Sequence, residues 1–461
     1  MTDLTPDSSA LAMAAAVAHK DISARELMQL HLARIAERNP ELNAIVSLDE
    51  ERALEGARAA DEHLARQGSI GPLHGLPFAV KDTHAAAGWR TTYGSPLYAD
   101  HVPDHDDLIV ERIRRAGVVL LGKTNVPEFA AGSHTFNKVF GTTRNPHDPT
   151  RSAGGSSGGA AAALASGMVP LADGSDMGGS LRNPASFCGV VGLRPSLGRV
   201  PTWPTGNLWE TTSVGGPMAR SVDDVALLLS VIAGPDPRTP IALGDAGRLF
   251  APPVTGSLAG LRVAFTPDLG GLIAVDHDVA AVTEEASRRF SRGGARVSSA
   301  WPDLSLGEDI FRTLRAWSFQ ASYGALLAEH PDSFKQSLAD NIRLGAELTG
   351  ADVARAYAER TQLVETMRLF FEEHDVLVLP VSQVPPFPAD QEFPTEINGE
   401  PMGSYLDWMR SAYLITVTGC PAISVPAGTT PDGLPVGVQI VAPHGADRRL
   451  LEVASAFAAA T

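Results

Sequence analysis

Two serines set among glycines restrict what this chain can fold into more than any other feature. The first is Ser156, in the run GGSSGG at residues 154–159, and the second is Ser180, in the run DMGGS at residues 176–180. Glycines allow a sharp turn and a close approach of the backbone to a bound group. A hydroxyl beside such a turn can attack a carbonyl carbon, and nearby backbone N–H groups can hold the oxyanion that forms. The sequence therefore predicts a nucleophilic site built on two loops.

A serine needs a partner that accepts its proton, and Lys81 is the candidate for this role. Histidine is the usual partner, but none of the 13 histidines lies in a pattern that marks a triad base. The residues around Ser180 also differ from the Gly-x-Ser-x-Gly elbow of α/β-hydrolases. Lys81 follows the apolar run Phe78-Ala79-Val80, which predicts a strand ending at the lysine. Burial lowers the pKa of a lysine, so that its neutral amine exists near pH 7 and can act as a base.

Phosphate binding is the alternative for the glycine-rich run at 154–159, since such loops often precede a helix. The run lacks the Lys-Ser/Thr pair of the Walker pattern, because Ala160 follows, and it contains no G-x-G-x-x-G. No group of His, Cys, Asp and Glu has the spacing of metal ligands. We therefore expect neither a cofactor nor a metal.

Charge and cysteine content limit the partners and the compartment. The chain has 53 acidic and 37 basic residues and a net charge of −16, which argues against nucleic acid. Its two cysteines, Cys188 and Cys420, lie in apolar surroundings and predict inert thiols in a reduced cytoplasm. The first residues lack a basic secretory region, and the apolar run at 10–18 is too short to cross a bilayer. We expect a cytoplasmic monomer or homodimer that acts on a small molecule and contacts no membrane.

Helical and short apolar segments alternate along the chain, which predicts an α/β layer architecture. We expect helices across much of 9–65, where Pro40 interrupts the pattern and Ser23 with Glu26 forms a capping box. Further helices are expected at 108–116, 160–166, 221–234, 279–293, 448–460 and over most of 308–375. Strands are expected at 76–80, at 118–121 ended by Gly122, and at 169–172, 260–265, 375–380, 422–426 and 436–441.

Several motifs, taken in order, resemble those of the amidase signature hydrolases. They are GPLHGLPFAVKD at 71–82, GKTNVPEF at 122–129, the loop at 154–159, the stretch 176–184 continuing to GVVGLRP at 189–195, GCPAISVP at 419–426 and GLPVGVQ at 433–439. The resemblance implies an α/β fold in which a mixed β-sheet core is sandwiched between layers of α-helices. It also implies a single domain over 1–461, with a signature core at about 71–235, a variable substrate-pocket region at about 240–400 and the C-terminal part of the core at 410–461.

The resemblance also implies roles at the matching positions. Ser180 would be the nucleophile, Ser156, which follows a cis peptide bond in the family, would relay its proton, and Lys81 would be the base. The backbone N–H groups of Met177, Gly178, Gly179 and Ser180 would form the oxyanion hole. Met177 stands where the family more often has Thr or Ile, and its side chain is expected to shape the pocket.

Three further residues are expected to support these loops. They are Ser157, Asp176 and Arg182. Asp176 is expected to accept backbone or hydroxyl hydrogen bonds. For Arg182 a brace formed with a carboxylate is favoured over the alternative of binding a substrate carboxylate.

The resemblance implies hydrolysis of the C–N bond of an amide through an acyl-enzyme. Aromatic residues that follow the catalytic region suggest a small apolar or aryl amide. The candidates for the pocket wall are Trp203, Trp209, Tyr405 and Trp408, with simple packing as the alternative. Carbamates (urethanes) or aryl esters could react by the same route. A glutaminase-type subunit of an aminoacyl-tRNA amidotransferase is an alternative of another class. A non-catalytic binding module is disfavoured, because Lys81, Ser156 and Ser180 are all present.

Overall fold

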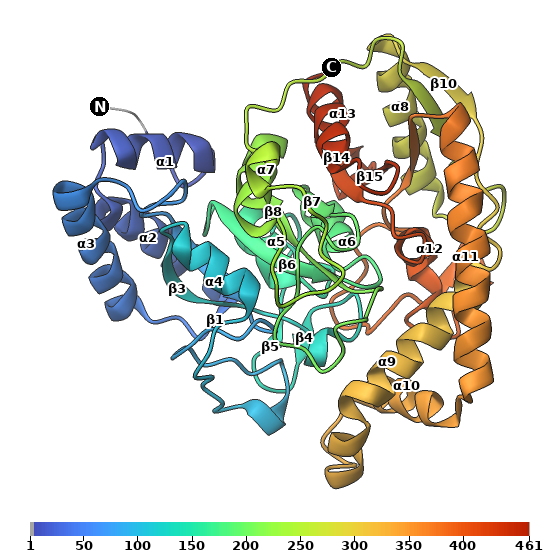
Figure 1. Ribbon diagram of the computed structural model, residues 1–461, viewed down its shortest axis with the longest axis horizontal. Helices are drawn as coiled ribbons and strands as arrows, with labels where there is room; N and C mark the ends of the chain where they lie inside the picture. Colours follow the sequence, from blue (N-terminus) through green and yellow to red (C-terminus); the bar gives the residue numbers. More distant parts are fainter. Residues whose placement is uncertain (1–3, 461) are drawn as a thin grey trace.

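The computed structural model describes residues 4–460 and builds them around one 11-stranded sheet (Figure 1). In the order in which they lie side by side, the strands are β1 (Ile45–Val46), β3 (Val119–Thr124), β2 (Pro77–Lys81), β6 (Leu171–Asp176), β8 (Val214–Ala219), β7 (Val191–Arg194), β14 (Ala422–Thr429), β15 (Pro435–Val441), β11 (Val376–Pro380), β9 (Arg262–Phe265) and β10 (Arg296–Ser299). Strand β2 runs parallel to β3 and β6, and β9 runs parallel to β10 and β11, while the other pairs are antiparallel. The predicted mixed sheet is therefore confirmed.

Helices surround this sheet. They are α1 (Ala10–His19), α2 (Ala24–Leu42), α3 (Glu50–Gln67), α4 (Leu108–Arg115), α5 (Gly158–Ala165), α6 (Arg182–Cys188), α7 (Val222–Ile232), α8 (His277–Arg292), α9 (Gly307–Glu329), α10 (Gln336–Glu347), α11 (Gly350–Glu373), α12 (Arg410–Thr416) and α13 (Asp447–Ala459). Short 3-10 turns occupy 96–98, 128–130, 247–250 and 407–409, and two small hairpins pair β4 (Phe136–Asn137) with β5 (Gly141–Thr142) and β12 (Glu396–Ile397) with β13 (Glu400–Pro401). None of the helices within residues 4–460 combines the length and the apolar character needed to cross a membrane.

Both faces of the sheet are covered, as the alternating side chains of β11 illustrate. Val376 and Val378 join the larger apolar core, which includes α1, α2, α5, α7 and α13, whereas Leu377 and Leu379 join a second core with α9, α11 and α12. Successive strand residues point to opposite faces, so a strand buried on both faces is apolar throughout. Figure 1 shows α1 to α3 at one end of the molecule and α9 to α11 at the other. The predicted α/β fold with helical layers is confirmed.

Two predicted helix caps are present, whereas the interruption expected at Pro40 is not. The expected capping box is present at α2, where Ser23 and Glu26 bond to each other's backbone N–H groups, and the hydroxyl of Ser221 caps α7. Pro40 does not interrupt α2, which continues to Leu42. Pro40 removes the hydrogen bond to the carbonyl of Ala36, but only two helical residues follow it, so the helix ends soon afterwards.

Gly122 does not end its strand as expected. Strand β3 continues to Thr124 and pairs with β1 there. A Cβ at Gly122 would lie 3.1 Å from the Cα of Leu48, so the glycine allows β3 to pass close to the crossing chain. Lys123 and Thr124 are thereby carried into the sheet beside Lys81.

All three segments distinguished in the sequence contribute strands to the one sheet. The signature segment supplies β2, β3, β6, β7 and β8, the segment at 240–400 supplies β9, β10 and β11, and the last segment supplies β14 and β15. Helices α9 and α10 pack against each other and, through a third apolar cluster, against the chain at Phe129. Residues of α9 line a common cavity with residues that follow β2 and β6, close to the predicted site residues.

Candidate active site

Lys81 is the last residue of β2 and is completely buried. Its backbone N–H donates to Asp173 Oδ1 at 3.0 Å, which fixes the end of the strand. Its Nζ lies 2.9 Å from each of three hydroxyl oxygens, those of Ser156, Ser157 and Ser175. The amine therefore contacts hydroxyl groups and, among the described residues, no carboxylate within 4 Å.

Burial controls the charge of this amine. Desolvation lowers the pKa of Lys81 to about 7, against the opposing attraction of Asp173 and Asp176. About half of the amine is then neutral at pH 7. A neutral amine has a free lone pair and can accept a proton from a neighbouring hydroxyl.

The loop at 154–159 is held by side chains from a neighbouring segment. Ser133 Oγ donates to the carbonyl of Gly155 and Thr135 Oγ1 to that of Gly154, both at 2.8 Å. The Gly155–Ser156 peptide bond is cis. A Cβ at Gly159 would lie 2.3 Å from the backbone N of Asn125, so only glycine fits where α5 meets this chain.

The second loop is organised around the carboxylate of Asp176, at the end of β6. Asp176 accepts hydrogen bonds from the backbone N–H groups of Gly179 at 3.0 Å and Leu181 at 3.1 Å. It also pairs with Arg182 at 2.9 Å and with Arg194 at 3.3 Å, all three side chains being fully buried. Although burial alone would raise it, these arginines hold the pKa of the Asp176 carboxyl well below its usual range. Arg182 thus forms the expected brace, and its guanidinium faces Asp176.

The two loops contact each other directly, since the N–H of Ser157 donates to the carbonyl of Ser180 at 3.2 Å. Within the described chain the N–H groups of Met177, Gly178 and Ser180 donate to no protein acceptor, so they are available to a bound oxyanion. Gly179 differs from the expectation, because its N–H is taken by Asp176. Of the four N–H groups expected to form an oxyanion hole, three therefore remain without a protein acceptor among the described residues.

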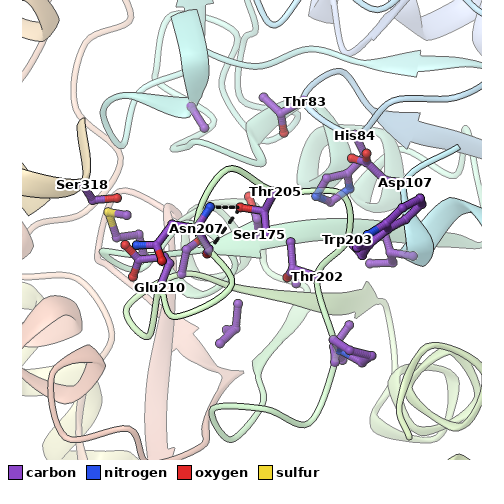
Figure 2. A pocket seen from close by; sticks show the side chains of 18 of the residues that line it. Thr83, His84, Asp107, Ser175, Thr202, Trp203, Thr205, Asn207, Glu210 and Ser318 are labelled. Atoms are coloured by element: carbon purple, nitrogen blue, oxygen red, sulfur yellow. Dashed lines mark hydrogen bonds between the residues drawn. The ribbon is translucent and has the colours of Figure 1, made fainter. Parts of the chain in front are cut away.

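A cavity of about 370 Å³ opens beside these loops. Ser156, Ser175, Ser180 and Met177 line it, whereas Lys81 lies behind the serines. Figure 2 shows Ser175 near the middle of the view, with His84 and Asp107 on one side and Ser318 with Glu210 on the other. The cavity thus joins the candidate nucleophile to walls supplied by distant parts of the chain.

Of the four aromatic residues expected in the pocket wall, only one lies there in the described structure. Trp203 lines the cavity. Trp209 does not line it and is 65% exposed, and Trp408 is buried in the second apolar core, where it stacks on Phe187. Tyr405 is also buried outside the lining, and its hydroxyl oxygen accepts a hydrogen bond from Arg315. Three of the four aromatic side chains are therefore corrected to packing or surface positions.

Sequence reasoning missed most of the cavity wall. The aromatic lining consists of Tyr93, Phe129, Phe319 and Tyr323 with Trp203, and the charged or titratable lining of His84, Asp107, Glu210 and Arg315. His84 Nδ1 donates to the buried carboxylate of Asp173, which also holds Lys81. Two of the lining residues could have been found from their places in the sequence, since each is close to a predicted site residue. Ser175 directly precedes Asp176, and His84 follows Lys81 by three residues. The residues of α9 carried no such signal.

The described part of the chain contains no group of three or more His, Cys, Asp or Glu side chains arranged to hold a metal ion. Both cysteines are buried, and burial raises the pKa of the Cys420 thiol to about 11 and that of the Cys188 thiol further. These thiols are therefore protonated at neutral pH and poor nucleophiles.

Comparison with known proteins finds relatives that match almost the whole chain. A family model described as Amidase matches residues 26–451. The chain is 38% identical over 454 residues to an acylamidase of Rhodococcus erythropolis, covering 98% of this chain and 95% of the relative. It is 39% identical over 470 residues to a glutamyl-tRNA(Gln) amidotransferase subunit of Thermus thermophilus, covering 97% and 96%. Among solved structures, a bacterial aryl acylamidase of the amidase signature family aligns with a TM-score of 0.91 at 30% identity, covering 98% and 96% of the two chains.

Replacing Asp176 by Asn should destabilise the fold as well as the site. The change leaves Arg182 and Arg194 buried without their carboxylate, and breaking such a pair typically lowers the free energy of unfolding by about 3–5 kcal/mol. The midpoint of thermal unfolding, followed by circular dichroism, should fall by several degrees. The control is Glu285→Gln, which removes an exposed carboxylate that also pairs with two arginines and should leave the midpoint nearly unchanged. Equal midpoints for both variants would contradict the role given to Asp176.

Proposed function

The chain belongs to the amidase family and is an amide-hydrolysing enzyme, and from that premise we propose a serine–serine–lysine mechanism for it. In this proposal Ser180 is the nucleophile, Ser156 relays its proton and Lys81 is the base. The observation that carries the proposal is the buried amine of Lys81, 2.9 Å from Ser156 Oγ, behind a cavity that Ser156 and Ser180 line.

The first step uses the lone pair of the neutral amine. Two of the three hydroxyl contacts of Lys81 can be filled by its own N–H groups, which leaves the lone pair to accept the proton of the third. We assign this third contact to Ser156, since it lines the cavity together with Ser180. As Ser180 Oγ attacks the carbonyl carbon, its proton passes to Ser156 and that of Ser156 passes to Lys81.

The negative charge that develops on the carbonyl oxygen would be held by the N–H groups of Met177, Gly178 and Ser180. Removing one donor of this kind typically raises the barrier by about 2.7–4 kcal/mol. The proton then returns through Ser156 to the leaving nitrogen, the C–N bond breaks, and an acyl-enzyme remains on Ser180. A water molecule repeats the sequence, giving its proton to the same relay, and releases the acid.

We propose a small amide with an aryl or apolar part as the substrate class. Five aromatic side chains line the cavity, and its volume of about 370 Å³ suits a small molecule. An enzyme of similar structure is an aryl acylamidase. Part of the wall comes from α9, so we assign substrate selection in part to the variable region at about 240–400, within the single domain proposed for 1–461.

A second candidate is the catalytic subunit of an amidotransferase that obtains ammonia from glutamine. One observation favours it: the sequence identity of this chain to the amidotransferase subunit of Thermus thermophilus, 39%, is close to its identity of 38% to the acylamidase. The aromatic lining favours the aryl amide instead, because a glutamine side chain offers those rings little apolar surface.

Replacing Ser180 by Ala should lower kcat by about 10⁴-fold or more, because the nucleophile is lost. The folded state should persist, and circular dichroism checks this. A covalent phosphonate probe should label the wild-type protein on the peptide that contains Ser180, as read by mass spectrometry. The control Ser424→Ala removes a buried hydroxyl on β14 outside the cavity lining and should retain both activity and labelling. A probe adduct on any other residue would refute the assignment of the nucleophile.

The pH profile should report the amine of Lys81. Since burial lowers its pKa to about 7, kcat/KM should rise with pH below about 7, where the amine is mostly protonated, and level off above it. Lys81→Ala should remove most of the activity together with this inflection. His84 also lines the cavity, so His84→Asn serves as the control and should keep the inflection. An inflection that survives in Lys81→Ala would assign the base to another group.

A substrate panel should separate the candidate functions. We expect kcat/KM to be highest for a 4-nitroanilide of a short acid, lower for the matching phenyl carbamate and aryl ester, and lowest for glutamine. Release of 4-nitroaniline is read by absorbance, and release of ammonia by a coupled assay. Faster cleavage of the carbamate would make the chain a urethanase, and a dominant glutaminase activity would favour the amidotransferase function.

A further inference from the structure

Arg315, on α9, is a buried cation in the wall of the substrate cavity. It is 4% exposed and lines the cavity together with Met177, Ser318 and Phe319. We propose that Arg315 binds a carboxylate carried by the substrate. This inference rests on the proposed function, because it assigns the residue to the cavity in which the amide would be cleaved.

The guanidinium of Arg315 has no carboxylate partner in the described chain. Its Nε donates to Asn341 Oδ1 at 3.3 Å, its Nη1 to Met177 Sδ at 3.3 Å and its Nη2 to Tyr405 Oη at 2.7 Å. All three acceptors are uncharged, and the thioether is a weak one. A buried charge without a counter-charge is unfavourable unless a ligand supplies one.

Other buried arginines pair with a carboxylate or donate their hydrogen bonds to backbone carbonyls. Arg182 pairs with Asp176, and Arg199 pairs with Asp447 at 3.0 Å. Arg360 also lacks a carboxylate partner, but it donates to the backbone carbonyls of Val417 and Thr211 and does not line the cavity. Arg315 therefore differs from them in both partners and position.

Donor counting shows that the guanidinium of Arg315 keeps two N–H groups for a ligand. A guanidinium has five N–H groups, and the three contacts above use one on each nitrogen. One N–H group on Nη1 and one on Nη2 are left, which is the pair that binds the two oxygens of a carboxylate. Phe319 lies under the guanidinium, 4.1 Å from its ring centre to Cζ, so the group is held in place before a ligand arrives.

Two acidic side chains, Asp107 and Glu210, line the cavity, and in the described structure neither forms an ion pair with Arg315. Ser318, three residues further along α9, lies on the opposite side of the view from Asp107 and His84 (Figure 2). Glu210 lies on the side of Ser318, and its Oε1 accepts hydrogen bonds from the backbone N–H and the hydroxyl of Thr212. A carboxylate near Arg315 would also approach Met177, whose N–H is part of the proposed oxyanion hole.

Two pairs of anilides test the proposal and show which half of the substrate carries the charge. The acyl pair is succinanilate and 4-oxopentananilide, in which a methyl ketone replaces the carboxylate. The amine pair is 4-butyramidobenzoate and 4′-acetylbutyranilide. We expect the charged member of one pair to have a kcat/KM about tenfold or more above that of its neutral partner, because only the anion neutralises Arg315.

Variants assign this preference to Arg315. Arg315→Gln should reduce the preference about tenfold or more while changing kcat/KM for the neutral member less than about threefold. Arg315→Lys should also reduce it, since an ammonium cannot form the two-pronged contact, and it carries the test if the Gln variant does not fold. The control is Arg312→Gln, one turn earlier on α9, where the arginine already pairs with Glu308 and Asp407 outside the lining. This control should keep the preference of the wild-type enzyme.

The outcomes separate this proposal from the proposed function. Cleavage of the neutral anilides without a preference for either charged member overturns the role of Arg315 and leaves the amidase mechanism standing. A preference that survives in both Arg315 variants, or an equal loss for both members of a pair, also overturns it and makes the residue structural. Failure to release an aniline from any of the four compounds counts against the proposed function instead.

Discussion

The rest of the site depends on an amine that is buried and contacts no carboxylate of residues 4–460. Desolvation alone lowers the pKa of Lys81, and a carboxylate at Nζ would restore its charge and remove its basicity. The two nearby acids are kept away by other partners. Asp173 binds the backbone N–H of Lys81 and the ring of His84, and Asp176 binds Arg182 and Arg194. The amine is left with three hydroxyl groups, so its charge can change near neutral pH.

This constraint explains why so much of the surrounding polar structure is rigid. In the proposed mechanism the lone pair of Lys81 needs a hydroxyl within hydrogen-bond distance. Ser133 and Thr135 fix the loop at 154–159, which carries that hydroxyl. Asp176 fixes the second loop in a similar way, because it accepts hydrogen bonds from the N–H groups of Gly179 and Leu181. Fixing the loop in this way uses the Gly179 N–H, which is therefore absent from the set that faces the cavity. The order of the site thus removes one potential oxyanion donor.

The burial of Lys81 and the tight loops that carry Ser156 and Ser180 could be predicted from the sequence because their signals are local. An apolar strand that ends in Lys81 predicts burial, and glycines around Ser156 and Ser180 predict tight loops whatever the rest of the chain does. The pocket wall could not be predicted in this way. Trp408 and Tyr405 are aromatic and near the family motifs, yet they pack into the core, whereas Phe319 and Arg315 of α9 line a common cavity with residues that follow β2 and β6. Gly122 and Pro40 also had effects that the local sequence did not predict. Close packing against a crossing chain explains Gly122, and the position of Pro40 near the end of its helix explains the other.

The residues that local signals predict and those that they miss lie in different segments of the chain and have different proposed roles. Lys81, Ser156 and Ser180 come from the signature segment, and in the proposed mechanism a change of a single contact among them would disturb proton transfer. Arg315 comes from the variable segment and contacts this machinery only through the side chain of Met177, at a position where the resembling family more often has Thr or Ile. A thioether accepts a hydrogen bond weakly, so Met177 holds the guanidinium without neutralising it. The charge that would select a substrate can therefore change by substitution on α9 without altering the pKa of Lys81 or the loops that carry the two serines.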